Sequence, residues 1–166
     1  AIVTHSYGDP EELFDGHSYP KSMMVMHMLR RHLGERLFRK GLALYVKRFF
    51  GRAAETHELK IAFEDATGVP LDGFVEQWLY DRGHPELKVS SSYDKRLGVC
   101  TLKIEQTQDK KSNREVFCFD LEVDVLDAKG KAQRVTIPVN ERSTAYTFAC
   151  KTAPKSVVAD PNYSLL

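Results

Sequence analysis

SYPKSMMVMHML, at residues 18–29, is the stretch that decides the fold of this 166-residue chain. Four of the seven residues from Met23 to Leu29 are methionine, and together with Val25 they make this stretch apolar on nearly all sides. A helix of that kind is typical of a buried element rather than a surface one. We therefore expect a central helix around which the later segments pack.

Both ends of this helix carry recognisable signals. Ser18 is a residue type that caps a helix by accepting a hydrogen bond from a first-turn amide, and Pro20 suits the first turn because its missing N–H costs nothing there. Gly34 can adopt the left-handed conformation that ends a helix. Tyr19 is thereby held on the first turn, which leaves two interpretations: a core tyrosine with its hydroxyl at the edge, or a positioned hydrogen-bond donor for chemistry.

Three further helices are predicted after Gly34. The first runs from about residue 35 to 50, because apolar side chains recur there at helical spacing: Phe38, Leu42, Tyr45 and Phe49. Thr56 is expected to cap the second, which runs to about Thr67, and Asp72 to cap the third. The basic residues of the first of these helices are interpreted as a solvated face. Short loops between the helices predict an antiparallel bundle.

From Leu87 onward the period of the apolar residues changes from 3.6 to 2. The alternating positions are Cys100, Leu102 and Ile104, then Phe117, Phe119, Leu121, Val123 and Val125, then Val135, Ile137 and Val139, and finally Tyr146, Phe148 and Cys150. Turn-forming residues separate these runs. Half-buried strands of this length predict a small antiparallel β-sandwich, so the chain as a whole is expected to have an α+β fold that divides near residue 86.

Composition excludes several classes of partner. The chain has 24 Lys and Arg against 23 Asp and Glu and no basic block, so we expect no nucleic-acid or anionic-membrane partner. No run of 18 apolar residues is present to span a bilayer, and no signal peptide is visible. The three cysteines are far apart and odd in number. They are interpreted as free thiols in a reducing compartment, which predicts a cytoplasmic protein.

The histidines do not form a metal-binding pattern. His5 and His17 have no ligand partner at helical spacing. His57-Glu58 begins the zinc-peptidase motif HExxH, but that motif needs its second histidine one turn later, where this chain has Ile61. We therefore expect no metal ligand and no cofactor-binding residue within these 166 positions.

Segments between about residues 10 and 90 resemble the aminopeptidase N family of zinc metallopeptidases, the gluzincins. The residues that carry the resemblance keep the family's spacing: Phe14-Asp15, Ser18-Tyr19-Pro20-Lys21, Met24-Val25, Met28-Leu29-Arg30, Leu33-Gly34-Glu35, Phe38-Arg39-Lys40-Gly41-Leu42, Tyr45, Ala54-Glu55-Thr56, Phe63-Glu64-Asp65-Ala66, Gly68, Phe74, Gln77-Trp78 and Gly83-His84-Pro85. The resemblance implies that residues 1–86 are the C-terminal helical part of a thermolysin-like catalytic domain. Residues 87–166 fit the small Ig-like β-sandwich that follows it.

The resemblance also implies a role for Tyr19. In that family, a tyrosine in a Tyr-Glu-Lys-Gly-Ala segment hydrogen-bonds the oxyanion of the tetrahedral intermediate. Tyr19 matches that tyrosine and Lys21 matches the lysine, so Tyr19 is expected to be a catalytic oxyanion stabiliser. Pro20 stands in place of the glutamate and Ser22-Met23 in place of Gly-Ala, so packing around the start of the helix must differ.

The family's zinc-binding half, HExxH with a later glutamate, is not found in these residues. The resemblance therefore implies a fragment of a zinc-dependent aminopeptidase that hydrolyses N-terminal residues from peptides, with zinc in the parent enzyme and none in the fragment. Its partners would be peptide substrates and the remaining domains of the same chain, and the fragment alone should be inactive. The alternative is a non-catalytic peptidase-like scaffold or interaction subunit, of the kind that serves in transcription complexes.

Overall fold

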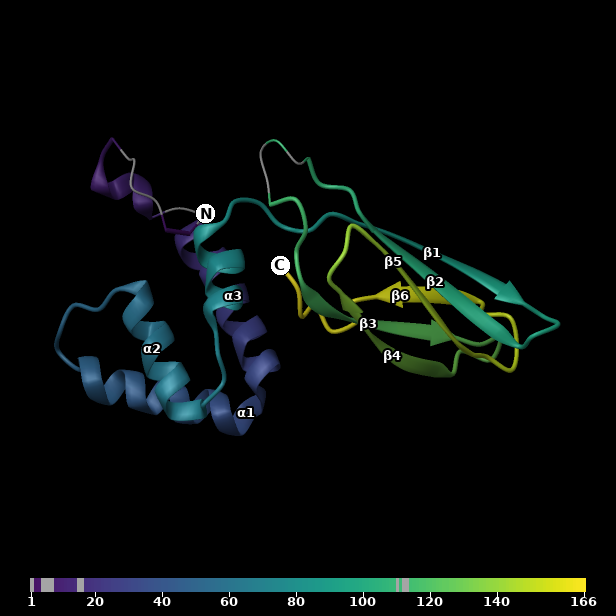
Figure 1. Cartoon of the computed structure of the whole chain (residues 1–166), viewed down its shortest axis with the longest axis horizontal. Helices are drawn as coiled ribbons and strands as arrows, with labels where there is room; N and C mark the ends of the chain where they lie inside the picture. Colours follow the sequence, from purple (N-terminus) through teal and green to yellow (C-terminus); the bar gives the residue numbers. More distant parts are fainter. Residues whose placement is uncertain (1, 4–7, 15–16, 110, 112–113) are drawn as a thin grey trace. The chain divides into compact units, whose positions relative to one another are not determined.

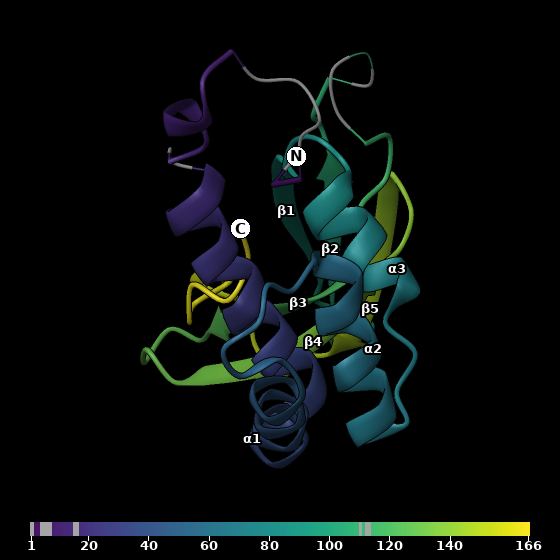
Figure 2. The ribbon, with the colours of Figure 1, turned by 90° about the vertical axis from the view of Figure 1, so that its left-hand side faces the viewer.

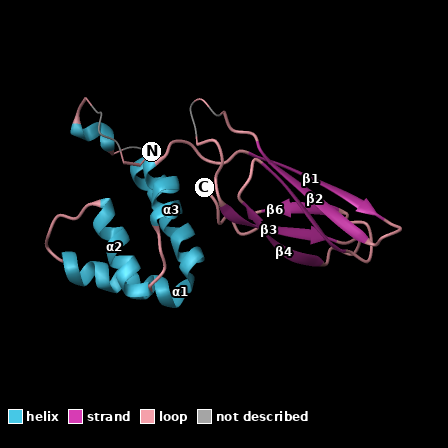
Figure 3. Cartoon of the chain, in the orientation of Figure 1, coloured by secondary structure: helices cyan, strands magenta, loops and turns pink. Residues whose placement is uncertain are grey.

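The computed structural model describes residues 2–3, 8–14, 17–109, 111 and 114–166. The chain divides into two compact units, one made of Ala1–Arg82 with the last residue Leu166 and the other of Gly83–Leu165. Helices make up the regular structure of the first unit and strands that of the second (Figures 1 and 3). The predicted α+β class, with a helical part followed by an antiparallel sandwich, is confirmed. The domain assignment to residues 1–86 and 87–166 stays a prediction.

The helical unit begins with two short turns and continues with longer helices. The elements are η1 (Pro10–Leu13), η2 (His17–Lys21), α1 (Ser22–Phe49), α2 (Thr56–Thr67), α3 (Asp72–Val75) and the π-helical η3 (Glu76–Tyr80), which continues α3. Gly34 has φ 75° and ψ 159°, so α1 consists of two helices that meet at a kink. Figure 2 shows the second of them end-on. The predicted helix end at Gly34 is thus confirmed.

Two predicted helix caps are wrong. Glu55, rather than Thr56, precedes α2, and it forms a capping box in which its backbone N–H donates to the Glu58 carboxylate at 2.7 Å. Asp72 is the first residue of α3 instead of its cap, and its carboxylate contacts the ammonium group of Lys60. At Glu55 the capping box decides where the helix begins, and at Asp72 the carboxylate is taken up by the ion pair with Lys60.

The methionine-rich first part of α1 is buried on one face only. Its buried residues are Val25, Met28, Leu29 and Leu33, which recur at the spacing of a single helical stripe. Met23 is 66% exposed. The expectation of a helix buried all round is therefore wrong within this chain, because the neighbouring elements cover only one side of this segment. Trp78 is buried in the same unit.

Gly41 allows α1 and α2 to approach closely. A Cβ atom at this position would overlap Cδ1 of Phe63, a side chain that is fully buried. Phe63 also belongs to the core of the unit, where it packs with Leu29, Leu33, Leu71 and Val75. The absence of a side chain at residue 41 is thus a requirement of this packing.

Gly41→Ala should lower the free energy of unfolding of the helical unit by about 1–3 kcal/mol, the usual cost of overpacking a core. Urea unfolding followed by the fluorescence of Trp78, the chain's one tryptophan, measures this effect. Gly73→Ala is the matched control, because Gly73 is also helical and has no atom within 4 Å of its added Cβ. Equal stabilities of the two variants would contradict the packing argument.

The strand unit contains two antiparallel three-stranded sheets. Its strands are β1 (Leu87–Asp94), β2 (Val99–Gln106), β3 (Phe119–Leu126), β4 (Ala132–Val139), β5 (Ser143–Ala149) and β6 (Ser156–Ala159), in the orders β1-β2-β5 and β4-β3-β6. Alternate residues of both sheets fill one core, as predicted: Cys100, Leu102, Ile104, Leu121, Val123, Val125, Ile137 and Val139. β6 was not predicted, because four residues are too few to show a period. All three thiols are free, with Cys100 buried, Cys118 exposed and Cys150 half-buried.

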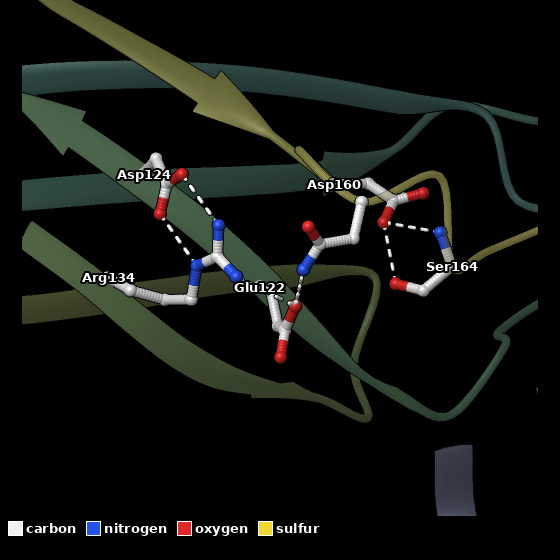
Figure 4. A network of polar contacts seen from close by, with 6 residues as sticks. Glu122, Asp124, Arg134, Asp160 and Ser164 are labelled. Atoms are coloured by element: carbon white, nitrogen blue, oxygen red, sulfur yellow. Dashed lines mark hydrogen bonds and ion pairs between the residues drawn. The ribbon is translucent and has the colours of Figure 1, made fainter. Parts of the chain in front are cut away.

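A polar network joins β3 to its neighbours (Figure 4). The guanidinium of Arg134 donates two hydrogen bonds of 2.7 Å to the carboxylate of Asp124, its cross-strand partner. Asn162 donates to Glu122 at 2.7 Å, and Asp160 accepts from the backbone and the hydroxyl of the serine four residues later. These contacts fasten the C-terminal turn and β4 to β3.

Asp124 should make the stability of the strand unit depend on pH. The hydrogen bond from Arg134 holds the pKa of Asp124 below its ordinary value of 3.8. Because the pKa is lower in the folded state, the carboxylate stabilises the fold above that ordinary value, and the stabilisation is lost as the pH falls through the folded-state pKa. Asp124→Asn should therefore lower the urea midpoint at neutral pH, and the difference should vanish as the pH is lowered toward about 2.

Asp120→Asn is the matched control for this pH dependence. Asp120 lies on the same strand, is exposed and forms no ion pair within the described residues. A pH-independent effect of Asp124→Asn, or an equal effect of Asp120→Asn, would contradict the assignment.

Candidate functional site

Tyr19 lies in η2, the turn that leads directly into α1. The neighbouring Ser18 does not cap a helix, which corrects the prediction. Its hydroxyl instead donates to the backbone carbonyl of Leu13, because the π-helical turn of η2 continues ahead of α1 and leaves no helix start at this residue. This bond ties the end of η1 to η2 and so helps to fix the turn that carries Tyr19.

The side chain of Tyr19 is 62% exposed. Its ring packs against that of Phe14, with centroids 6.2 Å apart and planes inclined by 31°. Phe14 is also exposed, so the two rings together form an apolar surface. Within the described residues the Tyr19 hydroxyl makes no hydrogen bond. The hydroxyl is therefore accessible to a ligand, and the role of Tyr19 as a catalytic group stays a prediction.

Lys21 comes from the same five-residue turn as Tyr19. Its side chain is half-buried, and this burial lowers the pKa of its ammonium group. A neutral hydroxyl donor and a cation are the groups that stabilise an anionic oxygen. The turn thus supplies both kinds of group from residues two positions apart.

The described residues do not fit a zinc site. None of them form a group of three or more His, Cys, Asp or Glu that could hold a metal ion. His57, the start of the incomplete HExxH motif, is exposed and lies 3.5 Å from a carboxylate oxygen of Glu55, while Glu58 serves as a capping residue. His5 and the side chain of His17 lie outside the described residues.

An open pocket of about 430 Å³ lies between α2 and the α3–η3 helix, and no sequence motif predicts it. Its lining residues are His57, Lys60, Asp72, Gly73, Val75, Glu76 and Tyr80. Lys60 contacts Asp72 and lies 3.9 Å from Glu64, and the hydrogen bond to Asp72 raises the pKa of Lys60. The cation in the pocket is thus already neutralised by its neighbours. The residues that line the pocket come from two separate segments, 57–60 and 72–80, so no local sequence pattern indicates the pocket.

Comparison with known protein families gives one match for each part of the chain. Residues 2–78 match the model of the peptidase family M1 domain. Over these residues the helical part of this chain is similar to peptidase family M1. The strand part, residues 82–159, matches the TAF2 Ig-like domain. The part that matches the M1 domain carries Tyr19, and the resemblance to the aminopeptidase family is confirmed.

Aminopeptidases are among the relatives of this chain. Aminopeptidase M1-A of Oryza sativa subsp. japonica is 34% identical over 105 residues, which are 63% of this chain and 11% of that protein. Puromycin-sensitive aminopeptidase of Caenorhabditis elegans is 37% identical over 93 residues, covering 56% of this chain and 10% of the relative. Aminopeptidase N of Haemophilus influenzae is 33% identical over 121 residues, which are 69% of this chain and 14% of that protein. The aligned parts therefore span only about a tenth to a seventh of these relatives.

A solved structure shares the fold. The crystal structure of Legionella pneumophila aminopeptidase A in complex with aspartic acid matches 99% of this chain with a TM-score of 0.83. The sequence identity is 21%, and the match covers 19% of that chain. Separately, no helix in the described part of this chain has the length and apolar character that crossing a membrane requires.

Proposed function

We propose that this chain acts as part of a zinc-dependent aminopeptidase that removes N-terminal residues from peptides, with Tyr19 as the oxyanion stabiliser. The match of residues 2–78 to the M1 domain carries the proposal, and the accessible hydroxyl of Tyr19 supports the assignment of its role. The described residues do not fit a metal site, so the zinc ligands would come from another part of a longer polypeptide. The other domains of that polypeptide and the peptide substrate would be the partners.

Tyr19 would act on the oxygen of the scissile carbonyl. Attack on the carbonyl carbon places negative charge on that oxygen, and a hydroxyl already held in position donates a stronger hydrogen bond to the anion than to the neutral carbonyl. The exposed face of η2 leaves the phenol open to such a ligand. The Lys21 cation on the same turn would favour the same charge. This interaction stabilises the transition state more than the ground state, which is what acceleration requires.

The isolated 166-residue chain is expected to bind no stoichiometric zinc and to cleave no aminoacyl reporter substrate. Metal analysis after dialysis and release of a fluorophore from an aminoacyl-aminomethylcoumarin measure these two properties. The longer polypeptide is expected to do both. Zinc retained at one equivalent by the isolated chain, or hydrolysis by it, would overturn the proposed division of the site.

A second candidate function is a non-catalytic peptidase-like scaffold. Two observations favour it: the strand part matches a domain named after TAF2 rather than after an aminopeptidase, and Ser22-Met23 stand where the resemblance expects Gly-Ala. The HExxH motif decides between the two candidates. A longer polypeptide that carries an intact HExxH with a later glutamate and hydrolyses peptides would support the enzyme, whereas a degraded motif would support the scaffold.

The free thiols support a reducing compartment, so we place this protein in the cytoplasm. The near balance of charges supports our prediction that neither nucleic acid nor a membrane is its partner.

A further inference from the structure

The second part of α1 presents an exposed face made of two neighbouring rows of side chains. The apolar row consists of Leu42 and Val46 of α1 and of Phe50, the residue directly after the helix; they follow one another at intervals of four and are 38%, 51% and 84% exposed. The basic row consists of Arg36, Lys40 and Lys47, all exposed, with the small Ala43 between the last two. Residues three and four apart are neighbours on a helix surface, so each row is continuous. We call these two rows the α1 face.

The basic row of the α1 face lacks counter-charges. α1 contains seven Lys or Arg and a single acidic residue, Glu35. Three other arginines of the helix are paired, two of them with Glu35 and one with Asp65. Arg36, Lys40 and Lys47 form no ion pair with any described residue. The face is therefore complementary in charge to an acidic partner.

The α1 face is also rigid before any partner arrives. The opposite side of the helix is fixed on α2 by the close contact of Gly41 with Phe63, and Phe38 packs on the same ring with centroids 5.6 Å apart. Unpaired charges would be costly to bury within one domain. An apolar row beside a charged, solvent-exposed row is instead the composition of an interface between separate proteins.

We propose that the α1 face docks an acidic amphipathic helix of another protein. The partner's apolar side chains would lie over Leu42, Val46 and Phe50, and the small side chain of Ala43 leaves room for them to approach, as ridges pack into grooves between helices. Its Asp and Glu side chains would meet Arg36, Lys40 and Lys47. A membrane surface is the less suitable occupant, because the packed side of α1 prevents the helix from sinking into lipid and only three apolar side chains face outward.

The probe for this test is a fluorescein-labelled synthetic helix of about 18 residues, long enough for five turns, with leucine in one row and glutamate in the next. Fluorescence anisotropy with the 166-residue chain should show saturable binding that weakens at higher salt. Lys40→Glu with Lys47→Glu should weaken binding at least about tenfold, and so should Leu42→Ser with Val46→Ser. Lys129→Glu, an exposed charge change in the strand unit, is the control and should leave the affinity unchanged.

A charge swap separates docking from misfolding. A second peptide, with lysine in place of each glutamate, should bind the Lys40→Glu/Lys47→Glu variant more tightly than it binds the unaltered chain. Amide shifts in a ¹H–¹⁵N spectrum should fall on residues 36–50. The proposal is overturned if a scrambled peptide of equal composition binds as well, if the charge swap restores nothing, or if phosphatidylserine vesicles bind the face while the peptide does not.

Discussion

Replacing Tyr19 with phenylalanine should lower the kcat of the proposed longer aminopeptidase by about 100- to 1,000-fold and leave KM nearly unchanged. The change removes one oxygen and keeps the ring that packs against Phe14. The expected loss corresponds to about 2.7–4 kcal/mol of transition-state stabilisation, the usual value for one oxyanion-hole donor. Substrate binding should persist, because the carbonyl oxygen carries its full negative charge only after attack.

Tyr163→Phe is the matched control for this experiment. Tyr163 is 84% exposed and lies in the strand unit, so the loss of its hydroxyl should change neither kcat nor KM. Tyr19 is itself exposed, and its substitution should shift the free energy of unfolding by less than about 0.5 kcal/mol. An unchanged kcat in the Tyr19→Phe enzyme would show that the Tyr19 hydroxyl has no catalytic role.

Gln106→Leu should destabilise the strand unit by about 3–5 kcal/mol, because it leaves several buried polar groups without partners. The Gln106 side chain is buried and donates to the carbonyls of Phe117 and Glu141 at 2.8 and 3.1 Å. It also accepts from the backbone N–H of Phe117 at 2.9 Å and from the amide of the buried Gln108 at 3.1 Å. Leucine has a similar size but can form none of these hydrogen bonds.

This network also holds the loop between β2 and β3. Gln108 donates to the carbonyls of Arg114 and Glu115, and its own amide oxygen accepts from the backbone of Glu86 at 3.3 Å. Urea unfolding followed by circular dichroism measures the loss, with the exposed Gln133→Leu on β4 as the matched control. Equal midpoints for the two variants would contradict the role of the network.

Several elements of the fold follow from short-range signals in the sequence. Gly34 was expected to end a helix, and its φ of 75° does so; the residues from Thr56 to Thr67 form the helix that was predicted. The alternation in β2 and β3 placed their core residues correctly, because a sheet with one buried face demands it. Gln106 continues the inward-facing row of Cys100, Leu102 and Ile104, so a polar residue at that position was a signal of a buried network that could have been noticed.

Other features depend on partners that are distant in sequence. The Met23–Leu29 segment is buried only on the side that other elements cover. Its hydrophobicity alone therefore predicts more burial than the structure shows. Asp72 turns toward Lys60, twelve residues earlier. At the candidate site, the resemblance indicated Tyr19, but the exposure of its hydroxyl and its contact with Phe14 required the structure.

The most direct measurement is a crystal structure of the longer aminopeptidase bound to a phosphinic pseudopeptide, whose tetrahedral phosphorus centre imitates the attacked carbonyl. The Tyr19 hydroxyl is predicted to lie about 2.7–3.1 Å from a phosphinyl oxygen, as an oxyanion donor must. A hydroxyl that faces solvent, or a different group at that oxygen, would contradict it.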